Sequence, residues 1–412
     1  MVVVCIGWNY GCRMAEPCRQ HWLRAALVFC VLFCVQNASA TPRVGVMTMQ
    51  PGAEYWARFG HNALLVDLQD GSEPLSYNFG YFDFEQPGFL SRFLRGDMRY
   101  LAVALPLSRD LSSYASEQRG VTVQWLNLNA TQTDRLIAHL REHVKPENAE
   151  YRYDYFTANC STKVRDALDS ALRGQLHTQL RSRSQGLTYR FEALRHASEL
   201  PWLLWGMDLG LGPMADKPLT VWQQSFIPQR LAEALRESVT ADGQPLVQRV
   251  ETLIADGPTT AADEPPSQVW TSLGVGILLA ALMQLPLRST PRVALLALLS
   301  FASTLGLTGF GLLALWLLTD HVAAWQNANL LLFNPLLAML LGGCAWLAVR
   351  RGIHPARDKL TSLSSNVWWM SVAVGWLLLQ LRNYPQSQAA WIGIVLPILL
   401  MVTFASRRAR LT

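Results

Sequence analysis

A single cysteine, Cys160, lies between the apolar run near the N-terminus and the apolar segments that begin at about residue 269. It ends the motif Tyr155-Phe-Thr-Ala-Asn-Cys160, and the next residues have the periodicity of a helix over 161–172. Asn159 is a good N-cap, which places Cys160 on the first turn, where free backbone N–H groups and the helix dipole stabilise a thiolate. Cys160 is therefore a candidate nucleophile. The alternative is a small apolar residue at a helix start, since free cysteines are often buried.

A thiol nucleophile needs a base, and His61 is the candidate because it follows Gly60 at the mouth of a predicted strand. A third polar group must fix the imidazole tautomer, and Asn78 on the next strand is the candidate for that role. Asn78 fits the interpretation of a turn or sheet-edge residue equally well. The other histidines of this region lie in polar helical segments and are expected at the surface; they are His139, His143, His177 and His196.

The elements that carry these residues predict an α+β domain over residues 41–257. Alternating apolar residues predict strands at 44–48, 63–67, 75–79, 100–105 and 121–128. Helical periodicity is found at 86–95, 110–119, 131–144 and 161–172. Asp70-Gly71 between the second and third strands is a hairpin signal. We expect a short antiparallel sheet packed by helices.

The composition points to a membrane protein. Half of the 412 residues are apolar and 16% are charged, against roughly 25% in an ordinary soluble domain. Intrinsic disorder is excluded, because it requires low hydrophobicity and many charges. Residues 268–412 hold only two acidic residues, Asp320 and Asp358, against ten Lys and Arg. The net charge of +5 therefore reflects basic loops of a membrane region, and no nucleic-acid partner is expected.

Five apolar segments follow a linker at 258–267 and predict an all-α bundle of about five transmembrane helices within 268–412. The spans are expected at 269–286, 293–318, 330–349, 367–381 and 390–406. Nine Lys and Arg lie in 287–292, in 350–366 and at the C-terminus, whereas one, Arg382, lies in the alternate loops. The positive-inside rule then places the domain of 41–257 outside the cytoplasm.

The N-terminus agrees with this orientation. Arg19 and Arg24 precede an apolar run at 25–35, and Ala38-Ser-Ala40 offers a cleavage site. Residues 1–40 are therefore expected to be a signal peptide or an N-terminal anchor.

The order His61, Asn78, Cys160 resembles that of circularly permuted papain-like thiol enzymes related to lecithin–retinol acyltransferase. More specific fragments resemble the Lnb-type bacterial lipoprotein N-acyltransferases, from about residue 41 to the C-terminus. These fragments are Phe59-Gly-His61, Tyr77-Asn-Phe-Gly80, Asn159-Cys-Ser-Thr162, Gly212-Pro-Met-Ala-Asp216, Trp222-Gln-Gln-Ser-Phe-Ile-Pro228, Thr319-Asp-His321 and Asn327-Ala-Asn-Leu-Leu-Leu-Phe-Asn-Pro335. Arg190, Asp208 and Asp216 match family positions too, although an ion pair within the fold explains them equally well.

The resemblance implies a permuted papain-like domain in the periplasm, carried by a multi-pass protein of the bacterial inner membrane. It implies a cysteine-dependent acyltransferase that moves a fatty acyl chain from a phospholipid donor to the N-terminal diacylglyceryl-cysteine amine of a diacylated lipoprotein. Cys160 would carry the chain as a thioester, with His61 as base and then acid. No cofactor and no metal is expected. In the polar loop 320–329, His321, Asn327 and Asn329 are candidates for lipid contact, with a plain interfacial loop as the alternative.

Two other functions would use the same residues differently. A papain-like cell-wall peptidase or amidase would carry the same thiol and imidazole, but has little need of five spans. A non-catalytic envelope lipid-binding module would leave Cys160 deeply buried and far from His61. The position of Cys160 relative to His61 therefore separates the enzymes from the binding module.

Overall fold

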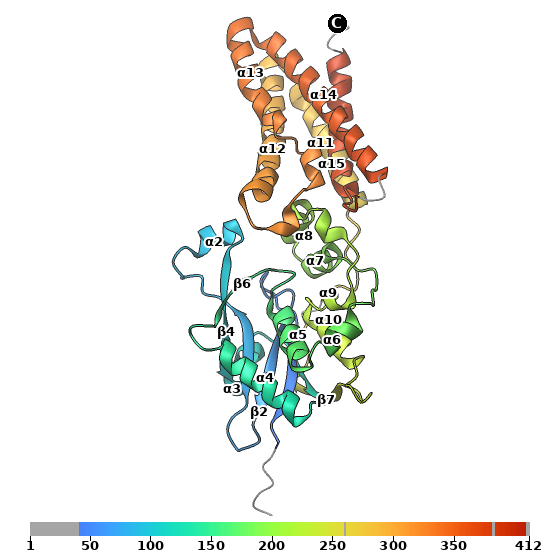
Figure 1. Cartoon of the computed structure of the whole chain (residues 1–412). Coiled ribbons are helices and arrows are strands. Elements are labelled where there is room, and N and C mark those ends of the chain that lie inside the picture. The colour runs from blue at the N-terminus through green and yellow to red at the C-terminus, as the bar shows by residue number, and fades with distance from the viewer. Residues whose placement is uncertain (1–40, 259–260, 381–383, 409–412) are drawn as a thin grey trace, which may run out of the picture. The chain divides into compact units, whose positions relative to one another are not determined.

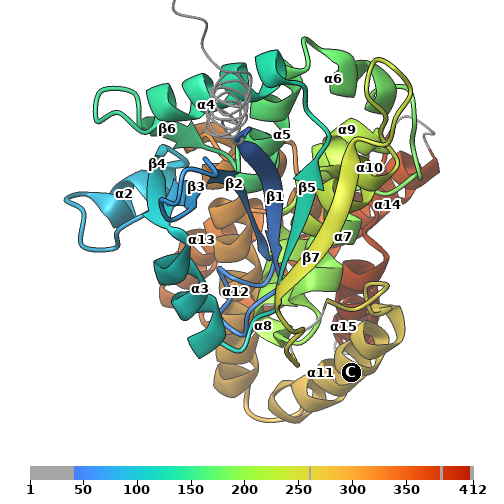
Figure 2. The same ribbon diagram turned by 90° about the horizontal axis from the view of Figure 1, so that it is seen from below.

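The computed structural model describes residues 41–258, 261–380 and 384–408 (Figure 1). Its sheet has seven antiparallel strands in the order β6-β4-β3-β2-β1-β5-β7, most of which can be followed in Figure 2. The strands are β1 (Arg43–Met49), β2 (His61–Asp67), β3 (Leu75–Tyr81), β4 (Met98–Pro106), β5 (Val121–Leu126), β6 (Glu150–Tyr153) and β7 (Val247–Ile254). Residues 68–72 form a turn of their own, in which the side chain of Asp70 accepts hydrogen bonds from the backbone N–H and the hydroxyl of Ser72.

The predicted α+β class is confirmed, and the five predicted strands are β1 to β5. The two strands that the sequence pattern missed, β6 and β7, are the edges of the sheet. An edge strand can expose most of its side chains, so it need not show a buried alternating face. In β7, Gln248, Arg249 and Val250 are exposed in succession.

Helices cover both faces of the sheet. α3 packs on the face that carries Met47, Ala63 and Val123. Because successive residues of a strand point to opposite faces, Gln124 points the other way, and its amide donates to the Ala232 carbonyl of α10 (2.9 Å). β1 and β2 are buried along nearly their whole length, which explains their apolar sequences. The helices are α2 (Phe89–Arg95), α3 (Leu107–Ser116), α4 (Ala130–His143), α5 (Cys160–Ala171), α6 (Gln175–Leu180), α7 (Tyr189–Ala197), α8 (Pro201–Gly210), η1 (Pro213–Asp216), α9 (Val221–Gln224) and α10 (Pro228–Arg236).

The four predicted helices of this domain correspond to α2, α3, α4 and α5, with shifted ends. A separate group of contacts, centred on Arg190 of α7, holds the segment from α7 to η1. Its guanidinium forms ion pairs with Asp208 and Asp216 (2.9 Å each) and donates to the Leu211 carbonyl (2.7 Å). The ion pair expected as one explanation of these three residues is therefore present.

The C-terminal part of the described chain is helical. Its elements are α11 (Val269–Leu287), α12 (Pro291–Leu318), η2 (Val322–Ala324), η3 (Ala328–Leu331), α13 (Leu336–Arg351), α14 (Ile353–Gln380) and α15 (Ala389–Arg408). Among the described residues, α11 and α12 are long and apolar enough to cross a membrane, with mean hydropathies of 1.6 and 1.9. The structure therefore supports two candidate spans, and the bundle of five stays a prediction.

Two predicted segments differ from the structure. The span expected from residue 330 starts as a helix only at Leu336, because residues 328–331 form η3 and Pro335 occupies the N-cap of α13. The basic segment 350–366, expected as a loop, is helical from Ile353 onward as part of α14. Hydropathy detects the apolar part of a helix and misses a polar extension that continues it.

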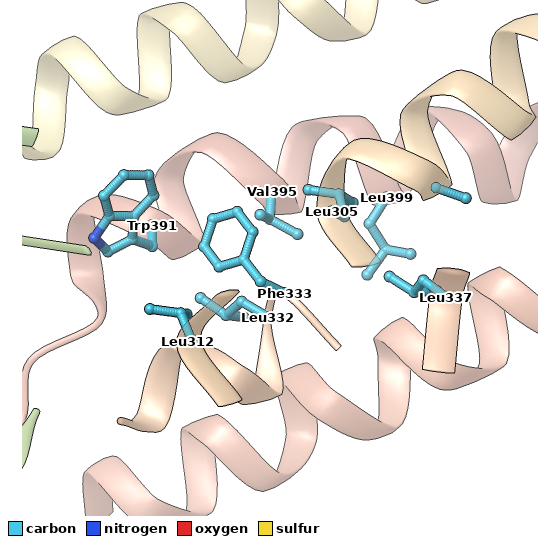
Figure 3. Packing of buried hydrophobic residues seen from close by; sticks show 9 residues of the cluster. Leu305, Leu312, Leu332, Phe333, Leu337, Trp391, Val395 and Leu399 are labelled. Atoms are coloured by element: carbon cyan, nitrogen blue, oxygen red, sulfur yellow. The ribbon is translucent and has the colours of Figure 1, made fainter. Parts of the chain in front are cut away.

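Residues from α12, from the segment 332–337 and from α15 form one apolar core (Figure 3). Leu312, Phe333 and Val395 are buried there among their neighbours. The rings of Phe333 and Trp391 meet edge to face, with centroids 5.4 Å apart. Trp205 of α8 contacts the same indole at 5.4 Å, so this core continues into the domain of the sheet.

Candidate functional site

Cys160 is the first residue of α5, as the Asn159 cap predicted. The Asn159 side chain accepts a hydrogen bond from the Thr162 N–H (2.9 Å), and the Thr162 hydroxyl accepts one from the Asn159 N–H (2.8 Å). The Asn159 amide also donates to the Phe226 carbonyl (2.8 Å), which fixes the helix start to the rest of the domain. Cys160 itself remains partly exposed, although Asn159 and Thr162 are buried. The fold thus places a partly exposed cysteine residue at a helix start that is bonded to the rest of the domain.

His61 is the first residue of β2, where the preceding glycine is required. Gly60 has a φ of +76°, and a Cβ there would lie 2.7 Å from the Met49 carbonyl oxygen. The imidazole Nε2 lies 2.9 Å from Oδ1 of Asn78, which is buried on β3. The predicted contact between His61 and Asn78 is therefore present, and Asn78 is not at a turn or at an edge of the sheet.

Asp110 determines how Asn78 is oriented. The Asn78 amide nitrogen donates to the Asp110 carboxylate (3.0 Å), and the Ser76 hydroxyl donates to the same oxygen (2.6 Å). A carboxylate only accepts hydrogen bonds, so the NH₂ group of Asn78 must face Asp110 and its carbonyl oxygen must face His61. That oxygen also only accepts, so Nε2 of His61 carries a proton. Nδ1 is left as the nitrogen that can take a proton from a thiol.

The side chains of His61 and Cys160 are close enough for each to shift the pKa of the other. Burial disfavours the imidazolium, but the negative charge of Cys160 and hydrogen bonds with Cys160 and Asn78 outweigh it and raise the pKa of His61. Burial disfavours the thiolate too, but the charge and hydrogen bond of His61 and the backbone N–H groups of Asn62 and Ser161 lower the pKa of Cys160. Both directions favour a thiolate–imidazolium pair over the neutral pair.

Two tyrosines of β6 complete the surroundings of the sulfur. Gly80 has a φ of +94°, and a Cβ there would lie 3.7 Å from the Tyr151 hydroxyl, 3.6 Å from the Tyr153 ring and 4.0 Å from Cβ of Cys160. The Tyr151 hydroxyl is buried and has no hydrogen-bond partner. Burial and the negative charge of Cys160 raise the pKa of Tyr151, so its hydroxyl stays protonated. It is a donor available to an oxyanion that forms beside the sulfur.

Neither Asp110 nor Tyr151 could be identified as a site residue from local sequence patterns. An Asp in the first turn of a helix complements the helix dipole and carries no further signal. Tyr151 belongs to the short edge strand that the pattern missed. Of the histidines expected at the surface, His196 is the exception: it is buried, and its ring stacks on Phe59 with centroids 5.2 Å apart.

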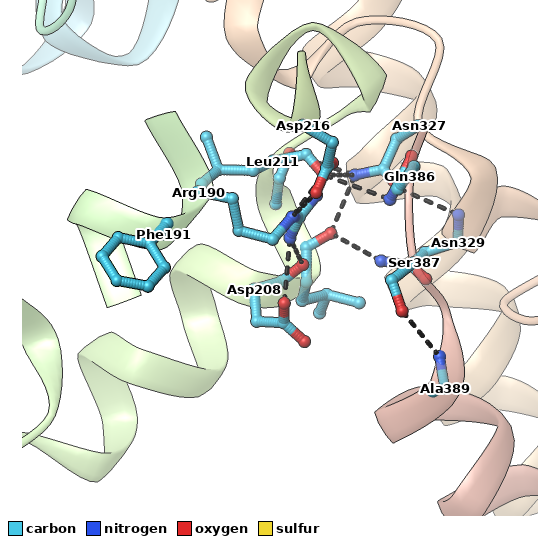
Figure 4. Close-up of polar contacts among 12 residues, drawn as sticks. Arg190, Phe191, Asp208, Leu211, Asp216, Asn327, Asn329, Gln386, Ser387 and Ala389 are labelled. Carbon is cyan, nitrogen blue, oxygen red and sulfur yellow. Dashed lines mark hydrogen bonds and ion pairs between the residues drawn. The ribbon is translucent and has the colours of Figure 1, made fainter. Parts of the chain in front are cut away.

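The three candidates for lipid contact lie in the segment that follows α12. The amides of Asn327 and Asn329 are buried and donate to the Leu209 carbonyl at the end of α8 (2.8 and 3.1 Å; Figure 4). Nε2 of His321 donates to the Phe93 carbonyl of α2 (3.0 Å). All three side chains therefore bond to the protein's own backbone and join this segment to the domain of the sheet. Their contact with lipid stays a prediction.

The thiolate–imidazolium pair predicts the pH dependence of Cys160 alkylation. In the wild type the thiolate is present at pH values below the ordinary thiol pKa of about 8.5. The rate of alkylation by iodoacetamide therefore reaches its plateau at a lower pH than for a free cysteine. His61→Gln removes the positive charge and leaves the burial, so its profile moves to higher pH. Rates measured from about pH 5 to 10, with the adduct mapped to Cys160 by mass spectrometry, check this. His143→Gln is the control, and identical profiles for the wild type and His61→Gln would contradict the pairing.

Asp110 is predicted to act as a positioning residue. In Asp110→Asn the new amide can donate or accept, so Asn78 is free to turn and the His61 tautomer is no longer fixed. We expect the alkylation profile to move to higher pH, with the rate on its acid side falling about tenfold for each unit by which the thiol pKa rises. Asp134→Asn on the exposed face of α4 is the matched control. An unchanged pH profile in Asp110→Asn would show that Asp110 only supports the fold.

Residues 36–195 match the Lnb N-terminal periplasmic domain family. No curated protein and no solved structure gives a significant match to the chain. The matched range contains His61, Asn78, Asp110 and Cys160, together with strands β1 to β6. The match and the two candidate spans are consistent with a membrane protein that has a periplasmic domain. In this range the chain is therefore similar to the periplasmic domain of the Lnb family.

Proposed function

We propose that this chain is a lipoprotein N-acyltransferase that uses Cys160 as its nucleophile. The observation that carries the proposal is the connected set Cys160–His61–Asn78–Asp110, in which a partly exposed thiol is activated within a domain similar to the Lnb periplasmic domain. The acyl donor is a phospholipid, and the acceptor is the N-terminal amine of a diacylated lipoprotein. The proposed site is the outer leaflet of the bacterial inner membrane.

In the first step the Cys160 thiolate attacks the carbonyl carbon of a phospholipid ester. The Tyr151 hydroxyl and the backbone N–H groups near the sulfur stabilise the oxyanion. The ester C–O bond then breaks, and the leaving lysophospholipid oxygen takes the proton of the His61 imidazolium. The product is an acyl thioester on Cys160 and a neutral His61.

In the second step the α-amine of the lipoprotein attacks the thioester carbonyl. Nδ1 of neutral His61 takes a proton from the amine as the amide bond forms. The C–S bond breaks and returns the thiolate beside the imidazolium, which restores the starting pair. Splitting the transfer into two displacements is the advantage that a thiol nucleophile offers.

Membrane attachment supports acyl transfer over peptide hydrolysis. Donor and acceptor both lie in one leaflet, so a catalytic domain tethered to that membrane meets them at a high effective concentration. The candidate spans α11 and α12 follow the domain directly and supply such a tether. A binding module without catalysis fits less well, because it predicts that Cys160 is far from His61, whereas the two side chains are close enough to shift each other's pKa.

The proposed function predicts the acylation state of lipoproteins in cells whose own N-acyltransferase has been replaced by this gene. The wild-type chain should restore the third acyl chain, and Cys160→Ala and Cys160→Ser should not, although both still reach the membrane. Mass spectrometry of lipoprotein N-terminal peptides measures this. Cys344→Ala, at the cysteine buried in α13, is the matched control and should behave as the wild type. Triacylated lipoproteins with Cys160→Ala, or diacylated ones with the wild type, would refute the proposal.

A further inference from the structure

Helix α2 and the segment before it expose several large apolar side chains. No residue of α2 is buried, and Leu90 and Leu94 are 66% and 59% exposed. Beside them Phe84 is 54% exposed. These side chains line an open hollow of about 430 Å³, which is formed by Phe84, Gln86, Gly88, Phe89, Leu90, Ser91 and Leu94. A contiguous apolar surface of this kind is typical of a site that contacts a membrane or a ligand. We call it the α2 surface.

The α2 surface is fastened to the residues that directly follow a candidate span. α12 ends at Leu318, and the backbone N–H of Asp320 donates to the Arg95 carbonyl at the end of α2 (2.7 Å). Arg152 of β6 forms an ion pair with the Asp320 carboxylate (3.0 Å). A Cβ on Gly96, the C-cap of α2, would lie 2.9 Å from the Asp320 backbone, so the two segments touch. The α2 surface therefore lies at the C-terminal end of the candidate span α12.

A strip of exposed aromatic rings continues from α2 to α8. Trp56 contacts Phe84 (centroids 5.7 Å apart) and Tyr55 (4.7 Å), and Tyr55 contacts Trp202 of α8 (5.8 Å). Trp56 and Trp202 are 48% and 62% exposed. The opposite end of α8 is held by Asn327 and Asn329, so α2 and α8 are both bonded to the segment 320–329. Trp and Tyr rings are enriched at the membrane–water interface.

A line of aromatic rings leads inward from the α2 surface to the sulfur. It runs through Phe84, Phe82, Tyr100 and Tyr153, with centroids 5.0, 5.1 and 4.5 Å apart. The Tyr153 ring lies beside Gly80, next to Cβ of Cys160. One end of this line is thus the exposed apolar hollow of the α2 surface, and the other end is the nucleophile.

We infer that the α2 surface binds phospholipid of the bilayer and leads one of its acyl chains along the aromatic line to Cys160. The occupant is a bilayer lipid because the surface is attached at the end of a candidate span, is apolar and aromatic, and carries the exposed cation Arg95, which suits a lipid phosphate. The delivery of the ester to the thiol rests on the proposed function, whereas the contact with lipid does not.

The contact with lipid is tested by photocrosslinking of the full-length chain in phosphatidylethanolamine–phosphatidylglycerol vesicles. The photoreactive residue p-benzoylphenylalanine replaces Leu90 or Leu94, and in the control it replaces Val250, an exposed residue of the edge strand β7. We expect phospholipid adducts by mass spectrometry at positions 90 and 94 and none at 250. Absence of lipid adducts, or crosslinks from 90 and 94 to residues 1–40 of the chain in their place, would overturn the inference.

Delivery to the thiol is tested with two acyl donors. Leu90→Glu combined with Leu94→Glu should slow acylation of Cys160 by vesicle phospholipid at least about tenfold, because charged side chains replace the apolar contacts. Acylation by p-nitrophenyl butyrate, which is short and water-soluble, should stay within about twofold, as should both reactions of Val250→Glu. Equal losses with both donors would overturn the route. Lipid adducts without any acyl-enzyme in the wild type would refute the proposed function and leave the membrane contact standing.

Discussion

The Asp110 carboxylate can only accept hydrogen bonds, and the direction of proton transfer at the site depends on that property. The carboxylate accepts a hydrogen bond from the Asn78 NH₂ group, so the Asn78 carbonyl oxygen faces His61. That oxygen accepts a hydrogen bond from Nε2 of His61, which leaves Nδ1 free to accept the proton of the thiol. Four elements, α3, β3, β2 and α5, each contribute one residue to this set. The antiparallel pairing of β2 and β3 positions two of these residues. Asn78 lies directly opposite Ala63, which is two residues after His61 on β2. The reactivity of Cys160 thus depends on the relative positions of two strands and two helices.

The parts of the site that follow from local rules could be predicted from the sequence. The cap at Asn159 needs only its neighbour Thr162, and the position of His61 at a strand start follows from Gly60 and the apolar alternation. Asp110 could not be predicted, because Ser76 and Asn78 are more than 30 residues away along the chain. Tyr151 was missed because β6 has only four residues, too few for an alternating pattern to be recognised. Long-range pairing and edge strands leave little trace in periodicity.

The same distinction explains the membrane region. Hydropathy identified α11 and α12, because a long apolar helix needs no partner to be recognised. It did not reveal that the polar segment after α12 folds onto the domain of the sheet. Asn327 reaches the Leu209 carbonyl across 118 positions of the chain, and the Asp320 N–H reaches the Arg95 carbonyl across a still longer separation. These contacts hold α2 and α8, which carry the exposed aromatic and apolar side chains, next to the end of the candidate span α12.

The most direct test is to isolate the acylated form of the protein. The full-length wild-type chain, mixed with phospholipid vesicles and no lipoprotein, should gain the mass of one fatty acyl chain. The modified peptide should contain Cys160, and neutral hydroxylamine should remove the chain, as expected for a thioester. Addition of a diacylated lipopeptide should return the protein to its original mass and yield the N-acylated lipopeptide. An N-acylated product formed while Cys160 stays unmodified, or formed equally well by Cys160→Ala, would contradict a thioester on this sulfur.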